Sequence, residues 1–332
     1  MKRVFSMMVA LATAIMGYSQ SSLVATLNHN GEISTFYGAT ALQEAHDASQ
    51  HGDAITLSSG TFTAVDITKA LTIRGAGMQV DSIAQILPTI ISGDFNIEIS
   101  DSIEQHLIME GIYNNNTISV KGTLKEASFQ KCRLNNFTYS NISSTKMDKL
   151  TFVHCKITSR LGFIGFASCV NCYINNPRNT ETSSSYDFLN CIIKESNTVS
   201  PFGFYNSNLT NCIVISNGYS LKSSNTVSYC LGTGASDIFK NVRNIESTII
   251  TSELSEIFKT YTGTYSDDET FELTDAAKVL YRGNDVKQVG MYGGNVPFNP
   301  NTTNPRIVKC NVASESTADG KLSVDIEVSA AK

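Results

Sequence analysis

The stretch Phe188-Leu-Asn-Cys191-Ile-Ile193 decides the fold, because it recurs with variation along the middle of the chain. Each copy has an apolar residue, two further residues, a cysteine and, two places later, usually a branched aliphatic residue. The other five copies lie at residues 129–134, 152–157, 169–174, 209–214 and 227–232. Successive cysteines are separated by 23, 17, 19, 21 and 18 residues. A repeated spacing of this kind is the signature of a solenoid.

Within each copy, the cysteine and the residue two places after it face the same side of a strand. The apolar residue three places before the cysteine can face that side only if the chain bends between them. Asn171, Asn190 and Asn211 stand at this bend, and asparagine tolerates the left-handed conformation well. We therefore predict an asparagine row at a corner of the solenoid. An inner ladder of small thiols is expected beside it, formed by Cys132, Cys155, Cys172, Cys191, Cys212 and Cys230.

Three earlier segments fit the frame if Gly75, Gly93 and Gly111 occupy the cysteine position. The strands are not separated by helical patterns of 10–15 residues, which disfavours a βαβ fold, and no leucine-rich frame recurs. The remaining fold class is all-β: a right-handed parallel β-helix with about 20 residues per coil and a rise of about 4.8 Å.

Both ends of a solenoid need caps, because a bare end exposes core and unpaired backbone. Residues 38–48 form an amphipathic helical pattern, and we place an N-terminal cap region at 20–52. The β-helix is expected over 53–298. Prolines at 297, 300 and 305 then mark an exit, and segments 307–312 and 322–328 alternate like two strands around Asp319-Gly320. Residues 299–332 are therefore predicted to form a β-hairpin tail.

The N-terminus has the pattern of a secretory signal peptide. Lys2 and Arg3 precede an apolar run at 4–16 that is short for a bilayer span, and small residues follow at 17 and 19. We predict cleavage between Ser19 and Gln20, so that residues 1–19 are removed; a membrane anchor is the alternative. The mature chain is then exported to the periplasm, the cell surface or the medium, and no later stretch is apolar enough to span a membrane.

Composition excludes other classes of protein. The chain has 332 residues, 41% of them hydrophobic, with 25 basic and 30 acidic side chains and a formal net charge of −5. Such a balance argues against disorder and against a polybasic nucleic-acid binder. The middle of the chain, 101–240, has 12 basic and 9 acidic residues, whereas the flanking parts are acidic. A basic middle could attract an acidic glycan.

The cysteines allow more than one interpretation. Cys169 and Cys172 have the spacing of a redox or metal motif, and a disulfide is possible in an exported protein. The repeat explains the pair more simply, because Cys169 occupies the place held elsewhere by Phe129 or Phe152. We therefore expect buried free thiols and no metal or other cofactor.

The ends of the repeat carry a resemblance to a known family. Residues 51–62 and 67–77 look like the opening coil of pectin-lyase-like β-helix proteins. Residues 270–273, 283–285 and 289–294 resemble the closing coil of secreted β-helix proteins from Bacteroidetes bacteria. This resemblance implies the fold but leaves the activity open, because the superfamily contains lyases, hydrolases, esterases and adhesins.

A polysaccharide lyase of this kind would need a basic proton abstractor and carboxylates that hold calcium against a uronate. Lys156, Arg160 and Arg178 are the candidates for the base, since they lie about one coil apart; outward solvated charges are the alternative. The acidic run 267–269 is read as a solvated turn, with calcium binding as the alternative. Aromatic side chains that could stack on sugar rings are Tyr113, Tyr139, Tyr173, Tyr205 and Tyr219.

The favoured function is that of an exported, non-catalytic and monomeric protein that binds a glycan or another surface ligand. One alternative is a polysaccharide lyase acting on a uronate glycan with calcium. Another is a structural or assembly protein held at the cell surface through its tail. No nucleic-acid partner is expected.

Overall fold

The computed structural model describes residues 23–82, 86–100, 106–139, 146–179, 184–195, 203–251, 253–302, 306–312, 319–321 and 323–329. The predicted signal peptide and its cleavage site, Ser19 and Gln20, lie outside these residues.

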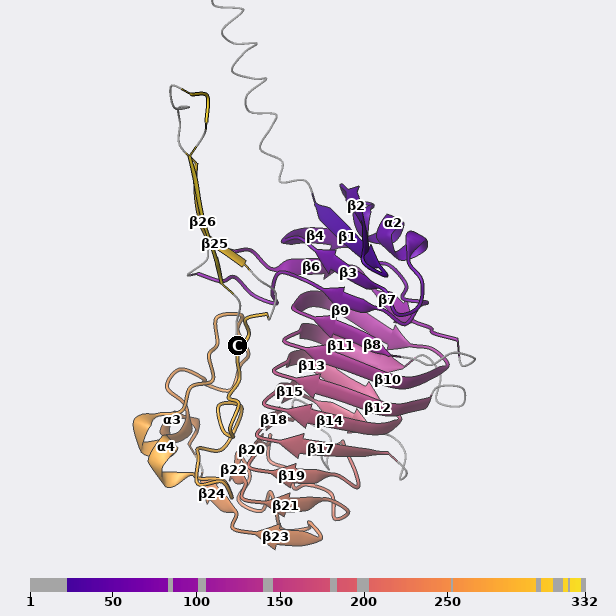
Figure 1. Ribbon diagram of the computed structural model, residues 1–332. Helices are drawn as coiled ribbons and strands as arrows, with labels where there is room; N and C mark the ends of the chain where they lie inside the picture. The colour runs from indigo at the N-terminus through magenta and orange to yellow at the C-terminus, as the bar shows by residue number, and fades with distance from the viewer. Residues whose placement is uncertain are drawn as a thin grey trace, which may run out of the picture.

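Two long sheets wind around one elongated core, as the stack of arrows in Figure 1 shows. The chain alternates between the sheets, so that neighbouring strands in each sheet come from successive coils. From β3 onward these neighbours pair in parallel. The predicted parallel β-helix is therefore confirmed, with about nine turns.

The first sheet has twelve strands. In spatial order they are β2 (Glu32–Tyr37), β1 (Val24–His29), β3 (Ala54–Leu57), β5 (Thr72–Arg74), β8 (Leu107–Glu110), β10 (Thr123–Gln130), β12 (Lys146–Val153), β14 (Gly165–Val170), β17 (Ser185–Leu189), β19 (Asn208–Thr210), β21 (Thr226–Ser228) and β23 (Asn244–Glu246).

The second sheet also has twelve strands, ten of them along one path. That path is β24 (Ile249–Thr251), β22 (Leu231–Thr233), β20 (Ile213–Ile215), β18 (Ile192–Lys194), β15 (Tyr173–Asn175), β13 (Lys156–Phe163), β11 (Arg133–Tyr139), β9 (Ile112–Val120), β6 (Thr89–Ser92) and β4 (Gly60–Thr63). The remaining two, β16 (Pro177–Asn179) and β7 (Phe95–Ile97), pair with β13 and β9.

The corner between the sheets has the left-handed conformation in all six repeats. The residue before each cysteine has φ between 51° and 55°. Three of these residues are the expected asparagines, and the others are Lys131, His154 and Tyr229. Each bend lets both the apolar residue before it and the cysteine after it enter the core.

The six repeat cysteines line the inside of the corner as buried free thiols. The thiols form hydrogen bonds with the backbone of adjacent strands. For example, the Cys155 N–H donates to Cys172 Sγ at 3.3 Å, and Cys155 Sγ donates to the Phe129 carbonyl at 3.2 Å. Burial raises the pKa of the Cys132 thiol. All six thiols are buried from solvent, so the ladder is a packing element.

The prediction that Gly75, Gly93 and Gly111 occupy the cysteine position is wrong, because the register of the early coils differs from the expected one. Pairing of Arg133 with Tyr113 puts Ile112, and not Gly111, level with Cys132. Gly111 lies at the corner, with φ of 66°. One coil earlier, Thr89 takes the cysteine position, because residues 76–88 form an insertion between β5 and β6. Gly93 comes after β6 and has no part in the corner.

The segment that follows β24 is not a coil. Residues 253–302, which we call the strap, contain α3 (Leu254–Ile257) and α4 (Asp275–Leu280). The strap runs back along the outside of the stack, against the second sheet (Figure 1). The last solenoid strand therefore ends at Thr251, so the expected β-helix of residues 53–298 is shorter, and 270–294 is not a closing coil.

The strap is bound to the corner row that it crosses. Asn171 Nδ2 donates to the carbonyls of Met291 and Gly293, at 2.8 and 2.9 Å. Asn211 exchanges two hydrogen bonds with Asn284, both of 2.9 Å. Asn171 and Asn211 thus have a second role, which is to hold the strap.

Apolar side chains complete this attachment. The residue after each cysteine points outward, and Tyr173, Ile192, Ile213 and Leu231 are nevertheless buried. They form a second core with strap residues, in which the rings of Tyr173 and Phe271 stack with centres 4.3 Å apart. These later repeats are apolar on both faces of the strand because the strap covers the outer face.

The two ends agree with the expected elements. Helix α2 (Ala41–Ala48) buries Ala41, Leu42 and Ala45 beside the first strands. At the other end, β25 (Arg306–Val312) and β26 (Val324–Ser329) form an antiparallel pair. Among the helices described, none combines the length and apolarity that crossing a bilayer requires.

Candidate functional site

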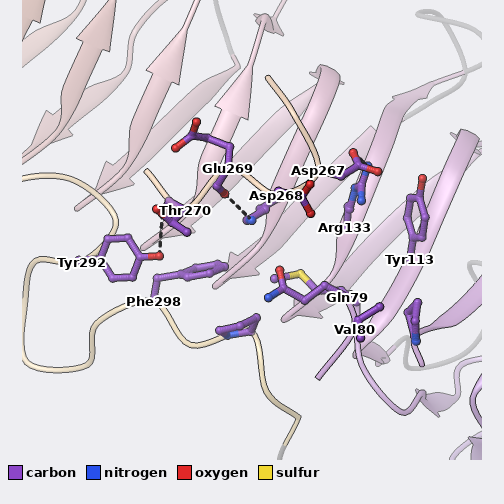
Figure 2. Close-up of a pocket in the computed structure, with 14 residues that line it drawn as sticks. Gln79, Val80, Tyr113, Arg133, Asp267, Asp268, Glu269, Thr270, Tyr292 and Phe298 are labelled. Atoms are coloured by element: carbon purple, nitrogen blue, oxygen red, sulfur yellow. Dashed lines mark hydrogen bonds and ion pairs between the residues drawn. The ribbon is translucent and has the colours of Figure 1, made fainter. Parts of the chain in front are cut away.

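A pocket of about 500 Å³ lies between the second sheet and the strap. Tyr113, Arg133 and Lys156 form its floor from successive strands, and Asp267 to Thr270 of the strap overhang it. Figure 2 shows Tyr113 and Arg133 on the sheet and Asp267 to Thr270 on the strap that faces them. Gln79 and Val80, from the insertion between β5 and β6, close a third side.

The pocket exists because the strap changes what it covers. The outward row of the second sheet reads Tyr113, Arg133, Lys156 and then Tyr173 along the stack. From Tyr173 to Leu231 this row is apolar and sealed by the strap. Over Arg133 and Lys156 the strap leaves a space, so these two side chains line a pocket although both are largely buried.

Lys156 lies at the inner end of the pocket and is 4% exposed. Its Nζ donates to the Glu269 carbonyl at 3.1 Å and stands 5.9 and 5.8 Å from the ring centres of Phe271 and Phe298. Burial, assisted by the nearby charge of Arg133, lowers the pKa of Lys156 to about 8. A fraction of this amine is therefore neutral at mildly alkaline pH.

Arg133 is held between two aromatic rings. Its guanidinium carbon lies 4.3 Å from the ring centre of Tyr113 and 5.6 Å from that of Tyr265. One terminal nitrogen forms an ion pair with Asp267. Stacking and pairing together restrict the guanidinium to one orientation.

The acidic residues of the strap have different roles. Asp267 and Asp268 are exposed, whereas Glu269 is buried. Its Oε1 accepts hydrogen bonds from Thr260 Oγ1 and the Phe271 N–H, at 2.8 and 2.9 Å. In Figure 2 this carboxylate points away from the dashed hydrogen bond at the Glu269 backbone carbonyl, which is the group that Lys156 binds. Glu269 therefore shapes the loop, whereas Asp267 and Asp268 present exposed carboxylates, of which that of Asp267 is paired with Arg133.

Of the three predicted basic residues, only Lys156 lines the pocket. Arg178 makes two hydrogen bonds of 2.8 Å to the fully buried Glu195. Arg160 lies on the same strand as Lys156, β13, but four residues further along it. At that point β13 is about to pair with β16, and Arg160 does not line the pocket. The structure does not bring the three side chains together in the pocket.

The predicted tyrosines are also divided. Tyr113 lines the pocket, and Tyr173 is buried beneath the strap. Tyr205 lines a separate cavity of about 510 Å³, where Lys222 Nζ lies 3.2 Å from its ring centre. Tyr139 and Tyr219 line neither cavity.

The sequence analysis did not identify Arg133. It expected a solvated turn at 267–269, and Asp267 and Asp268 do form an exposed turn, but Glu269 is buried and the run overhangs the pocket. A signal for Arg133 was present, because it occupies the outward position after Cys132 and Lys156 the same position after Cys155. The proximity of the acidic run could not be inferred, since 134 residues separate Arg133 from Asp267.

Over the part of the chain that the structure describes, no three histidine, cysteine, aspartate or glutamate side chains are grouped so that they could hold a metal ion. No family model matches this chain, and neither the curated proteins nor the solved structures include a significant match to it. The geometry of the pocket therefore carries the functional argument.

The buried amine leads to a prediction about stability and pH. Replacing Lys156 with methionine is expected to raise the free energy of unfolding at pH 7 by about 1–2 kcal/mol, because the cost of burying a charge exceeds one lost hydrogen bond. The folded protein releases this proton near pH 8, whereas the unfolded chain holds it until its ordinary value of 10.5. Wild-type stability therefore gains relative to the variant as the pH rises through this interval.

Urea unfolding of both proteins between pH 6.5 and about 10.5 measures this difference. The exposed Lys240→Met serves as the control and should show no such pH dependence. A Lys156→Met advantage that stays constant over the whole range would contradict the explanation.

Proposed function

We propose that this protein is an exported β-helix protein of the pectin-lyase-like type that binds a glycan in the pocket between the second sheet and the strap. The observation that carries the proposal is the pairing of aromatic faces with fixed polar groups in one hollow. Tyr113, Tyr292 and Phe298 supply the rings, and Arg133 and Asp267 supply the donors and acceptors.

Sugars require both kinds of surface. The carbon-bound faces of a pyranose ring are apolar and pack on aromatic rings, whereas its hydroxyl groups need hydrogen-bond partners once water is displaced. Planar side chains that are already held in place supply those partners at a low cost in entropy. Arg133 is stacked, and Tyr292 donates its hydroxyl to the Thr270 carbonyl at 2.7 Å, so much of the pocket is organised before a ligand arrives.

A polysaccharide lyase is the second candidate, favoured by Lys156. A lyase removes a proton beside a uronate carboxyl group, and an amine with a pKa of about 8 is suited to that step. The position of Lys156 at the inner end of the pocket supports this alternative. Its burial counts against it, since a base must reach the proton that it removes and Lys156 is only 4% exposed.

The test is a binding measurement against neutral and uronate oligosaccharides by titration calorimetry. Tyr113→Ala should weaken binding of the best ligand by about tenfold, the loss expected for a ring that stacks on a sugar. Tyr205→Ala, which removes a tyrosine from the other cavity, should leave the affinity unchanged. Absence of binding to the whole panel, or equal losses in the two variants, would reject the proposed site.

The same uronate polymers, incubated with the protein and calcium, test the second candidate through the ultraviolet absorbance of unsaturated products. A rise that Lys156→Met abolishes would replace binding with lyase chemistry as the function of the pocket.

A further inference from the structure

The charges in the pocket discriminate between classes of sugar. Both of its cations are already engaged, since Arg133 pairs with Asp267 and Lys156 donates to the Glu269 carbonyl. Asp267 and Asp268 stand exposed on the overhanging loop. An entering anion would therefore meet two carboxylates before it reached either cation.

The Arg133–Asp267 pair is also poorly suited to binding a uronate carboxylate. A uronate carboxylate is best bound by two parallel N–H groups of one guanidinium, and Asp267 already takes one terminal nitrogen of Arg133. Stacking on Tyr113 holds the plane of the guanidinium, and its Nε is buried without a hydrogen-bond partner, so Asp267 takes one of the two terminal nitrogens that remain for a ligand.

What the pair presents instead is a donor next to an acceptor. Two adjacent hydroxyl groups of a sugar match this arrangement, because one can donate to the aspartate while its neighbour accepts from the guanidinium. Such a contact leaves the ion pair in place and requires no charge on the ligand.

From this geometry we infer that the pocket takes uncharged oligosaccharides with adjacent hydroxyl groups, and that Asp267 is the residue that excludes uronates. The inference rests on the proposed glycan binding and specifies its ligand class. It also makes the basic character of the middle of the chain a poor guide to the ligand, because the acidic strap folds over it.

Titration calorimetry with two sets of probes tests the inference. The neutral set contains cello-, xylo- and manno-oligosaccharides, and the acidic set contains oligogalacturonates and oligoglucuronates. The wild-type protein should bind at least one neutral probe about tenfold or more tightly than any acidic probe of equal length. Asp267→Asn preserves the shape of the side chain and should raise the affinity for the acidic set by about tenfold.

Asp187→Asn is the matched control, since it removes the same charge from an exposed position on the first sheet. It should not change the preference. If the wild-type protein prefers uronates, or if Asp267→Asn and Asp187→Asn give the same ratio of affinities, the inference is wrong while glycan binding stands. If no probe of either set binds, the proposed function fails as well. The wild-type preference needs no variant, so the test holds even if Asp267→Asn does not fold.

Discussion

Arg178→Met is expected to lower the free energy of unfolding by about 3–5 kcal/mol, because it leaves the Glu195 carboxylate in the protein interior without its cation. Glu195 is 0% exposed, and both of its oxygens accept from Arg178. The Gly203 N–H also donates to it, at 3.3 Å, so the pair ties the loop before β19 to β16. Urea unfolding at neutral pH measures the loss.

The double variant Arg178→Met, Glu195→Gln gives the matched comparison, because it removes the buried charge together with its partner. It should recover a large part of the lost stability. Equal destabilisation of the single and double variants would show that the packing of Arg178, and not its charge, is what matters. Either result would separate Arg178 from the chemistry of the pocket, which it does not line.

Asn171→Gly is expected to lower the free energy of unfolding by about 2–4 kcal/mol, because two buried strap carbonyls lose their donor. Asn171 donates to the carbonyls of Met291 and Gly293, and both contacts are buried. Glycine keeps the left-handed corner at no steric cost, so the substitution isolates the hydrogen bonds from the backbone conformation.

Asn190→Gly is the control. Asn190 has the same conformation, with φ of 52° against 51° for Asn171, and its Oδ1 has no hydrogen-bond partner. Its replacement should cost about 1 kcal/mol or less. Hydrogen exchange of the strap amides between residues 289 and 298 should accelerate in Asn171→Gly alone. Similar effects in both variants would mean that the asparagines serve only the corner.

These expectations show that an asparagine in the corner row can serve the corner conformation, the attachment of the strap, or both. The period of about 20 residues, the inward cysteines and the corner at Asn171 follow from strand geometry and from the conformational freedom of asparagine. Nothing in that pattern distinguishes Asn171, which holds the strap, from Asn190, because the distinction depends on a segment 120 residues away. The regular spacing of the repeat also gave no sign of the long connection between β5 and β6. The early glycines were therefore assigned to the cysteine position, which Thr89 and Ile112 occupy.

The pocket also combines features that the sequence shows with features that depend on contacts between distant segments. Lys156 was a candidate because its residue type and place in the repeat were visible, and Arg160 and Arg178 were equally visible. Burial and partners separate them: Lys156 lies in a hollow, whereas Arg178 is neutralised by Glu195. The acidic run 267–269 begins with the exposed turn that was expected, but its isolated sequence contains no sign of the pocket that it faces.

The sequence by itself determined the solenoid, its period and its thiol ladder, because each coil repeats the same short-range constraints and stacking adds them in register. Only the tertiary structure decided that the chain turns back after Thr251 and that the strap seals Tyr173 while leaving Arg133 and Lys156 in a pocket. The physical reason is the sequence separation over which the interactions act. Strand alternation and corner geometry act over a few residues, whereas the pocket depends on contacts between residues more than 100 positions apart.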